Sequence, residues 1–228
     1  MPNRFEQGAD VNIGEIARLA GVSRSTVSYA LSGKRPVSEE TRERVAQSIK
    51  LLGYQPHAGA RALASAKSNV LALVMPLRGD LYVPVMMDIA IAVTTTARRF
   101  GYDVLLLTND EGPDGIRRVA TSARADAVIL TDVGMEDERI AMVRRTGVDA
   151  VLIGVPADSA GLDCVDLDFA RAGRLCVEHL AALGHREVAF IGEAQGIYQR
   201  HIGFAERTLG GIRDAAAESG MKIGRAHV

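Results

Sequence analysis

One stretch determines how the first part of this chain folds, namely Gly21-Val22-Ser23-Arg24-Ser25-Thr26-Val27-Ser28-Tyr29-Ala30-Leu31. It opens with a glycine turn, and Ser23 then caps a helix that keeps its polar and aromatic side chains away from its apolar face. A helix that buries one side and places the other in the major groove of DNA is built in this way. We therefore predict a recognition helix, in which Val22, Val27 and Leu31 close a small core.

A helix is predicted on each side of this stretch. The first begins after Asn12, which can cap it, with Glu15 completing a capping box. The other runs from its cap Ser38 to a stop at Gly53. Their apolar residues recur at helical spacing, namely Ile16, Ala17 and Ala20 in the first and Val45, Ile49 and Leu52 in the second. A protein-binding bundle is the alternative, but it would leave Arg24, Ser25 and Tyr29 exposed for no packing reason.

Charge is distributed unevenly along the 228 residues. Residues 1–68 hold 10 Lys and Arg against 6 Asp and Glu, whereas the other 160 hold 17 against 22. A basic first part suits a chain whose first part meets phosphates. Cys164 and Cys176 lack the spacing of a metal site or a disulfide framework, and we see no secretory signal or membrane-length apolar run. We expect a cytoplasmic protein with no metal and no cofactor.

From residue 69 onward, short apolar runs alternate with amphipathic stretches. Strands that are apolar on both faces and alternate with helices are typical of parallel sheets covered on both sides. We therefore predict an all-α head followed by an α/β body. The expected strands are 70–75, 104–107, 127–130, 150–153, 164–165 and 188–191, and the expected helices are approximately 84–100, 115–121, 136–145, 170–183 and 205–219.

Polar residues follow several of these strands. Ligands of a parallel sheet bind beyond the carboxyl ends of its strands, and there this sequence has acids such as Asp80, Asp132 and Asp168. The alternative is that each acid merely caps the helix that follows. The body shows no phosphate-binding glycine loop, nucleophile elbow or metal-spaced His and Cys cluster. It is predicted to bind a ligand, with no catalytic residues.

Three segments resemble the lactose-repressor (LacI/GalR) family of bacterial transcription regulators. They are Ile16-Ala17-Arg18-Leu19-Ala20-Gly21-Val22-Ser23 with Thr26-Val27-Ser28; Val37-Ser38 with Thr41-Arg42-Glu43-Arg44-Val45; and Leu52-Gly53-Tyr54-Gln55-Pro56 with Ala60-Arg61-Ala62-Leu63-Ala64. The likeness covers nearly all of residues 11–222, including Leu180-Ala181-Ala182-Leu183-Gly184-His185-Arg186 before a strand. It implies a parallel-sheet sandwich of two lobes, related to periplasmic binding proteins, with a small effector between the lobes.

The resemblance also implies a set of DNA contacts. Arg24, Ser25 and Tyr29 would read base edges, and an arginine on guanine contributes about 1–3 kcal/mol of discrimination. Hydroxyl side chains of the same helix would mainly hold phosphates, which set register without reading sequence. The expected DNA-binding residues outside the base-reading group are Ser23, Thr26, Ser28, Ser32, Tyr54, Ala60, Leu63 and Ala64.

Residues 58–65 resemble the family's hinge helix, whose leucine, here Leu63, wedges into the minor groove. So short a helix is unstable alone, and ordering it costs about 1–2 kcal/mol per residue. Two hinges of a homodimer, packed together on a kinked pseudopalindromic operator, can offset that cost and the unstacking of bases. A small reorientation of the lobes would then decide whether the hinge forms. The alternative is that Leu63 only packs between domains.

The family's effector-binding arginine lies three residues before a Gly-aromatic pair that opens a helix. Arg200 precedes Gly203-Phe204 in this way, although a solvated loop arginine is the alternative. The other expected effector contacts lie at or just beyond strand ends, namely Asp80, Tyr82, Asn109, Asp132 and Asp168. Family effectors are often sugars, and purines and other metabolites also occur.

Family members are longer than this chain by about half, so the resemblance implies an incomplete second lobe. Ile223-Gly224-Arg225-Ala226-His227-Val228 resembles the product of a widely used sequencing adapter, and we expect the genuine sequence to end near Lys222. The expected organisation is a disordered leader (1–10), a helix-turn-helix domain (11–56), a hinge helix and linker (57–68), a first lobe (69–166), a partial second lobe (167–222) and the added tail (223–228).

These features predict a dimeric repressor that binds double-stranded DNA and responds to a small molecule such as a sugar. An activator would use the same machinery. A sugar-metabolising α/β enzyme fused to a helix-turn-helix head is the second hypothesis, and turnover of a sugar or nucleotide would favour it. A solute-binding protein is the third, but it would carry a secretory signal and lack the basic head.

Overall fold

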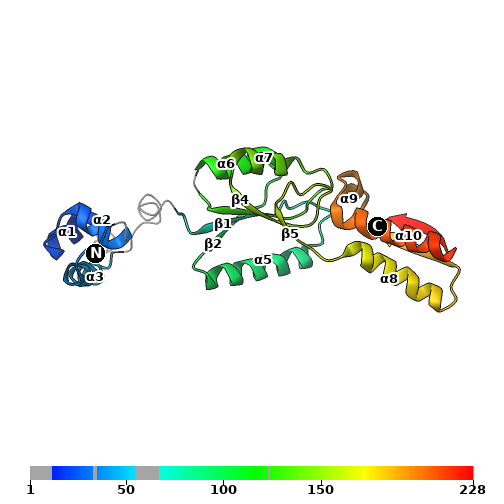
Figure 1. Ribbon diagram of the computed structural model, residues 1–228, viewed down its shortest axis with the longest axis horizontal. Coiled ribbons are helices and arrows are strands. Elements are labelled where there is room, and N and C mark those ends of the chain that lie inside the picture. The colour runs from blue at the N-terminus through cyan, green and yellow to red at the C-terminus, as the bar shows by residue number, and fades with distance from the viewer. Residues whose placement is uncertain (1–11, 33–34, 55–66, 123, 228) are drawn as a thin grey trace, which may run out of the picture. The chain divides into compact units, whose positions relative to one another are not determined.

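The computed structural model describes residues 12–32, 35–54, 67–122 and 124–227 (Figure 1). The chain divides into two compact units, residues 1–68 and residues 69–228. The leader expected at 1–10 and the hinge residues Ala60, Leu63 and Ala64 lie outside the described residues.

Caps set the ends of the helices in the first unit. α1 (Ile13–Ala20) begins at a complete capping box, in which the Asn12 side chain accepts from the amides of Gly14 and Glu15, and the Glu15 carboxylate accepts from the Asn12 amide at 3.1 Å. It ends at Gly21, whose φ of 65° is left-handed and suits glycine. α2 (Arg24–Ser32) follows the turn, and α3 (Glu39–Leu52) runs from its cap Ser38 to Gly53.

One face of each helix builds the core of this head. Val27 of α2 is fully buried, but Leu31 in the last turn of α2 is 38% exposed. The prediction that Leu31 closes the core is therefore wrong, because Ala30 and Leu52 pack against the core instead. The buried residues are Ile16, Ala17, Ala20, Val27, Val45 and Tyr54.

A parallel sheet organises the second unit. Its strands are β1 (Val70–Val74), β2 (Asp103–Leu107), β3 (Ala127–Leu130), β4 (Asp149–Ile153) and β5 (Asp163–Val165). Their order is β2-β1-β3-β4-β5, and every neighbouring pair is parallel. The chain leaves β1 toward β2 and returns to β3 on the other side, so the loops after β1 and β3 diverge. A crevice forms at such a switch point, beyond the carboxyl ends of the strands.

Helices cover both faces of this sheet (Figure 1). α6 (Gly112–Ser122) and α7 (Glu138–Thr146) pack on one face, where Ile116 and Val143 join the core with Ala72 and Leu130. α5 (Val83–Arg99) lies on the other face, with Ala90 packed near Leu73 and Met75. The predicted α/β body with a parallel sheet between helices is confirmed.

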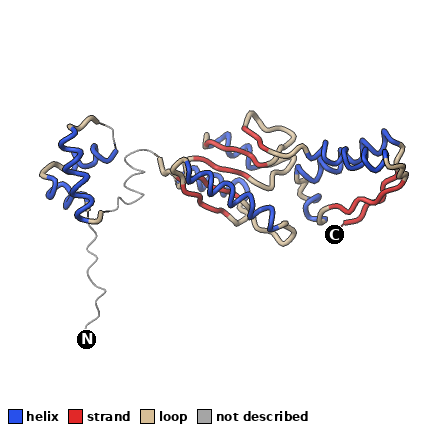
Figure 2. The backbone as a smooth tube through the Cα atoms, turned by 90° about the horizontal axis from the view of Figure 1, so that it is seen from below, coloured by secondary structure: helices blue, strands red, loops and turns tan. Residues whose placement is uncertain are grey.

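The second lobe continues from β5. It comprises α8 (Phe169–Ala182), β6 (Glu187–Gly192), α9 (Gln195–Gln199), α10 (Gly203–Ser219) and β7 (Lys222–His227). Figure 2 shows the two strands of this lobe apart from the main sheet. β6 and β7 pair in parallel, so residues 223–227, which the sequence analysis assigns to an added tail, occupy a strand. Neither α9 nor β7 was among the elements predicted from the sequence.

Two glycines allow α8 and α10 to approach each other closely. A Cβ atom on Gly211 of α10 would lie 1.9 Å from the Ala170 carbonyl oxygen, and one on Gly173 of α8 would lie 2.5 Å from the Thr208 carbonyl oxygen. Both contacts are with backbone, so a side chain at either place would force the helices apart. This packing fixes the middle of α10 against the first turns of α8.

Candidate functional site

A cluster of hydroxyl groups marks the start of α2. The Thr26 amide donates to Ser23 Oγ at 3.1 Å, so Ser23 caps the helix. Ser23 Oγ also shares hydrogen bonds with Ser25 Oγ at 2.7 Å and with Thr26 Oγ1 at 2.8 Å. The three side chains are therefore held together at a helix N-terminus, where backbone amides and the helix dipole favour a phosphate.

The remaining side chains of α2 extend this polar surface. Arg24 is exposed, and it lies over the start of α1 because Gly14 has no side chain there: a Cβ would meet Arg24 Nη2 at 2.7 Å. Tyr29 is half-buried, and the guanidinium carbon of Arg35 lies 5.4 Å from the centre of its ring. Arg35 is not among the residues predicted from the sequence to bind DNA, although it follows Lys34 shortly after the end of α2. Ser28 is half-buried, and Ser32 is the last residue of α2.

Tyr54 lies in a different environment from the other predicted DNA contacts. Its side chain is buried in the core of the head, with 7% of its surface exposed. The backbone continues from the C-cap Gly53, and the Tyr54 amide donates to the Ile49 carbonyl oxygen at 3.1 Å. Tyr54 thus connects the end of α3 to the core of the head.

A cavity of about 440 Å³ lies beyond the carboxyl ends of the strands in the second unit. This is within the usual size range of sites for small ligands. Its lining comes from the loops after β1, β3, β4 and β5, from α5, and from the second lobe. The lining residues are Asp80, Leu81, Tyr82, Val85, Met86, Ile89, Thr131, Asp132, Val133, Ile153, Gly154, Asp166, Phe169, Glu193, Ile197, Arg200, Ile202 and Phe204.

Four of the six predicted effector residues line this cavity, namely Asp80, Tyr82, Asp132 and Arg200. The other two lie elsewhere. Asn109 borders a separate small hollow next to Glu111. Asp168 is exposed and accepts the Arg171 amide at 2.9 Å, so it caps α8, as the capping alternative for strand-end acids allows.

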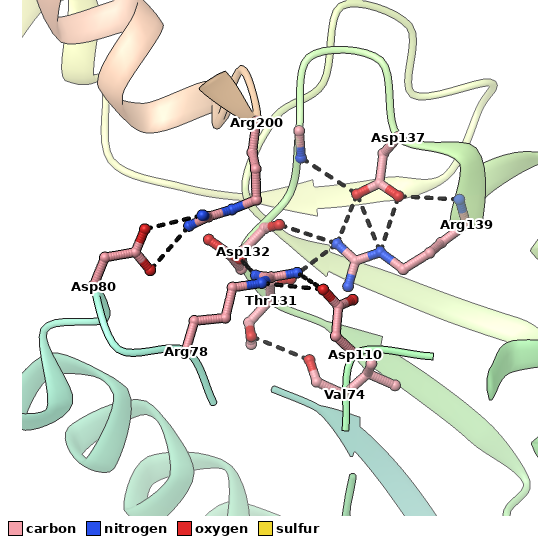
Figure 3. Close-up of polar contacts among 10 residues, drawn as sticks. Val74, Arg78, Asp80, Asp110, Thr131, Asp132, Asp137, Arg139 and Arg200 are labelled. Atoms are coloured by element: carbon pink, nitrogen blue, oxygen red, sulfur yellow. Dashed lines mark hydrogen bonds and ion pairs between the residues drawn. The ribbon is translucent and has the colours of Figure 1, made fainter. Parts of the chain in front are cut away.

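Ion pairs hold several charged groups at the cavity and beside it (Figure 3). Arg200 donates to both carboxylate oxygens of Asp80, from Nη1 at 2.9 Å and from Nη2 at 3.2 Å. The hydrogen bond and charge of Arg200 lower the pKa of Asp80, against the effect of burial. Arg78 pairs with Asp132 and, at 2.7 Å, with Asp110. Arg78 therefore ties together the loops that follow β1, β2 and β3.

A second ion pair supports the loop after β3. Arg139 donates to Asp137 at 2.6 Å and also to the carbonyl oxygens of Thr131 and Asp132, at 3.0 and 3.1 Å. Burial alone would raise the pKa of Asp137, but the bonds and charge of Arg139 outweigh burial and lower this pKa. These bonds hold Asp132 in a left-handed conformation with a φ of 53°, which is uncommon for a residue with a side chain.

Aromatic and apolar side chains form the rest of the wall. Phe169 at the start of α8 and Phe204 at the start of α10 have ring centres 5.5 Å apart. Asp166 lies beside them in the lining, and desolvation raises the pKa of its carboxyl group. A few polar groups within an apolar wall can orient a small polar ligand.

Three residues of the site were not predicted from the sequence, namely Arg78, Asp166 and Phe169. Arg78 lies two positions before Asp80 in the same strand-end segment. A basic residue among the acidic strand ends is a signal from which this ion pair could have been predicted. Within the described ranges, no group of His, Cys, Asp and Glu is arranged to hold a metal ion, and no helix is long and apolar enough to span a membrane.

Two family models match the chain. Residues 12–57 match the bacterial regulatory proteins of the lacI family, and residues 68–228 match the periplasmic binding proteins and sugar binding domain of the LacI family. Catabolite control protein A of Staphylococcus xylosus is 27% identical over 93% of this chain and 63% of that protein. The HTH-type transcriptional regulator AglR of Rhizobium meliloti strain 1021 is 30% identical over 96% of this chain and 61% of that protein. The HTH-type transcriptional regulator RafR of Escherichia coli is 33% identical over 93% of this chain and 62% of that protein. The chain thus spans less than two thirds of the length of these relatives.

Several solved structures have the same fold as this chain. The lac repressor dimer bound to operator and the anti-inducer ONPF has a TM-score of 0.74 at 23% identity, over 95% of this chain and 64% of that chain. This match shows the fold. A Lacl family regulator from Silicibacter pomeroyi has a TM-score of 0.68 at 25% identity (95% and 64%), and the CelR–cellobiose complex has 0.55 at 26% (95% and 66%). The chain therefore belongs to the LacI family of bacterial regulatory proteins.

Proposed function

We propose that this protein is a dimeric, sequence-specific transcriptional repressor that acts in the cytoplasm and binds a pseudopalindromic operator. The observation that carries this proposal is the exposed polar edge of α2, on a helix whose Val27 side is fully buried. Its similar curated proteins include named transcriptional regulators. A small effector in the cavity of the second unit would change the affinity for DNA.

The geometry of α2 supports phosphate contacts by some of its side chains and base contacts by others. The hydroxyl cluster of Ser23, Ser25 and Thr26 lies where phosphates are favoured, and Ser25 can also reach a base edge from this position. Arg24 and Tyr29 are the proposed base readers. Arg35 beside Tyr29 is a further cation for the DNA backbone. Tyr54 is left out of the direct contacts because its side chain is buried.

The cavity supports a neutral polyhydroxylated effector such as a sugar. Hydroxyl groups need donors and acceptors in fixed positions, and Asp80, Asp132 and Arg200 provide both kinds. Phe169 and Phe204 provide apolar surface beside them. One similar protein, CelR, has been solved as a complex with cellobiose. We propose Asp80, Tyr82, Asp132 and Arg200 as the contacts.

The outer side of α5 supports the dimer. Val83, Met87 and Ile91 recur every four residues and are 55%, 47% and 56% exposed. Residues at this spacing form one stripe along a helix, and an exposed apolar stripe is typical of an interface. A second copy that buries this stripe would join two heads in one molecule, and a pseudopalindromic operator has one half-site for each.

Selection of random DNA duplexes by the 228-residue chain tests the proposal, followed by dissociation constants of the selected duplex at 50 and 200 mM salt. We expect a palindromic sequence and weaker binding at the higher salt concentration. Arg24→Ala should weaken binding to the selected duplex about 5- to 150-fold for each half-site and relax the choice at one symmetric base pair. Thr26→Ala should weaken selected and random duplexes alike.

Arg213→Ala is the matched control, since it removes the same charge from an exposed position on α10. It should leave the choice of sequence unchanged. The proposal fails if no duplex is preferred at either salt concentration. The effector part is tested separately, by thermal shift with mono- and disaccharides including cellobiose, where Phe204→Ala should abolish any shift.

A further inference from the structure

The two lobes of the second unit are joined by backbone hydrogen bonds near the turn before α10. The Met135 amide donates to the His201 carbonyl oxygen at 2.8 Å, and the Gly203 amide donates to that of Val133 at 2.9 Å. Arg207 of α10 adds bonds to the carbonyl oxygen of Val155, at 3.1 and 3.2 Å. These contacts fix the second lobe to the loops after β3 and β4.

The Asp80–Arg200 ion pair is a contact of another kind. It joins the loop after β1 to the second lobe by side chains alone, across 120 positions of sequence, and both side chains line the cavity. The two side chains are 20% and 31% exposed, so water reaches the pair. An ion pair in this position can open while the backbone contacts remain.

Gly196 makes room for this pair. A Cβ atom on Gly196 would lie 2.6 Å from Asp80 Oδ2 and 3.2 Å from Arg200 Nη1. The φ of Gly196 is not in the left-handed region, so its backbone would accept alanine. The atoms in the way are the ends of two flexible side chains. An alanine would therefore displace the ion pair and leave the fold in place.

Arg200 is also incompletely satisfied. Its two Nη groups bond to Asp80, but its Nε is buried and has no hydrogen-bond partner among the described residues. A buried donor without a partner costs free energy. A guanidinium held in this way gains from exchanging partners when another acceptor enters the cavity.

We propose that the Asp80–Arg200 pair is a latch between the lobes, that Gly196 is the residue that permits it, and that any ligand bonding to Arg200 must exchange with Asp80. The latch sets how readily the cavity opens. The exchange of a ligand with Asp80 rests on the proposed function, whereas the latch itself requires neither DNA nor effector.

Hydrogen exchange of the 228-residue chain, followed by mass spectrometry, tests the latch. The variants are Asp80→Asn, Arg200→Gln, their double variant and Gly196→Ala. Each single variant should speed exchange at least about threefold in both segments that the pair joins, residues 78–82 and 195–203, because both lose one shared restraint. The double variant should be no faster than the faster single variant.

Gly210→Ala is the matched control, since a Cβ there would meet nothing within 4 Å. It should leave both segments unchanged. Exchange in β1 and β3 should stay at the wild-type rate in every variant, which shows that the sheet remains folded. The latch is overturned if Asp80→Asn affects only residues 78–82, or if the effects of the single variants add. An unchanged Gly196→Ala would overturn the role of that glycine.

Discussion

Adding one methyl group to Gly211 should separate α8 from α10 and destabilise the second lobe. The Cβ atom of Gly211→Ala would lie 1.9 Å from the Ala170 carbonyl oxygen. An ordinary contact between these atoms is about 3.3 Å, so the two backbones must move apart by about 1.4 Å. The atom in the way belongs to a backbone and cannot rotate aside.

The cost follows from the packing that this movement would disrupt. α8 and α10 share a core with Val177, Ile212 and Ala216. A gap of even 0.5–1 Å forfeits about a quarter to a half of the dispersion energy at such contacts. Overpacking costs about 1–3 kcal/mol, and the upper value of about 3 kcal/mol applies here because the backbone atom cannot rotate aside. Since alanine gains about 1 kcal/mol in helix propensity, we expect a net loss of about 2 kcal/mol.

Gly210→Ala is the neighbouring control, because its Cβ would point into open space. It should gain about 0.5–1 kcal/mol from helix propensity alone. Urea unfolding followed by circular dichroism should therefore separate the two variants by about 3 kcal/mol. Equal midpoints for the two variants would refute the claim that close backbone approach fixes this lobe.

Two further predictions concern charge and assembly. The folded pKa values of Asp137 and Asp80 are lowered by Arg139 and Arg200, so their contribution to stability is complete above the ordinary carboxyl pKa of about 4 and is lost as the pH falls through the lower folded values. Urea midpoints should fall as the pH decreases below 5; Asp137→Asn should flatten this dependence while costing about 3 kcal/mol or more at pH 7, because it leaves the buried charge of Arg139 without an opposite charge. Ile91→Lys should shift the sedimentation coefficient toward that of a monomer, whereas Thr121→Lys, exposed on α6, should not; a dimer that survives Ile91→Lys would exclude the stripe on α5.

The sequence predicts most of the fold because its signals are local. The capping box at Asn12 and Glu15, the cap Ser38 and the stops Gly21 and Gly53 each depend on a few neighbouring residues. The apolar runs of the parallel strands are equally local. α9 has only five residues and β7 contains Lys222 and Arg225, so neither carries a periodic apolar pattern long enough to be read.

The candidate effector site is harder to predict because it depends on pairing between distant segments. Asp132 and Asp168 look alike in sequence, since each follows a strand. In the structure Asp132 pairs with Arg78 at the cavity, whereas Asp168 caps α8. The difference arises from which strands flank the switch point between β1 and β3, and that order is a property of the whole sheet.

Charge pairing at the cavity has a consequence for the choice of ligand. Arg200 and Arg78, two of the three arginines labelled in Figure 3, are both already held by carboxylates. An anionic ligand would have to displace a carboxylate and leave it near its own charge, which disfavours binding. A neutral ligand with hydroxyl groups also separates Asp80 from Arg200, but it can accept from Arg200 and donate to Asp80 at the same time. We therefore expect a neutral ligand to bind this cavity more tightly than an acid or a phosphorylated compound of similar shape.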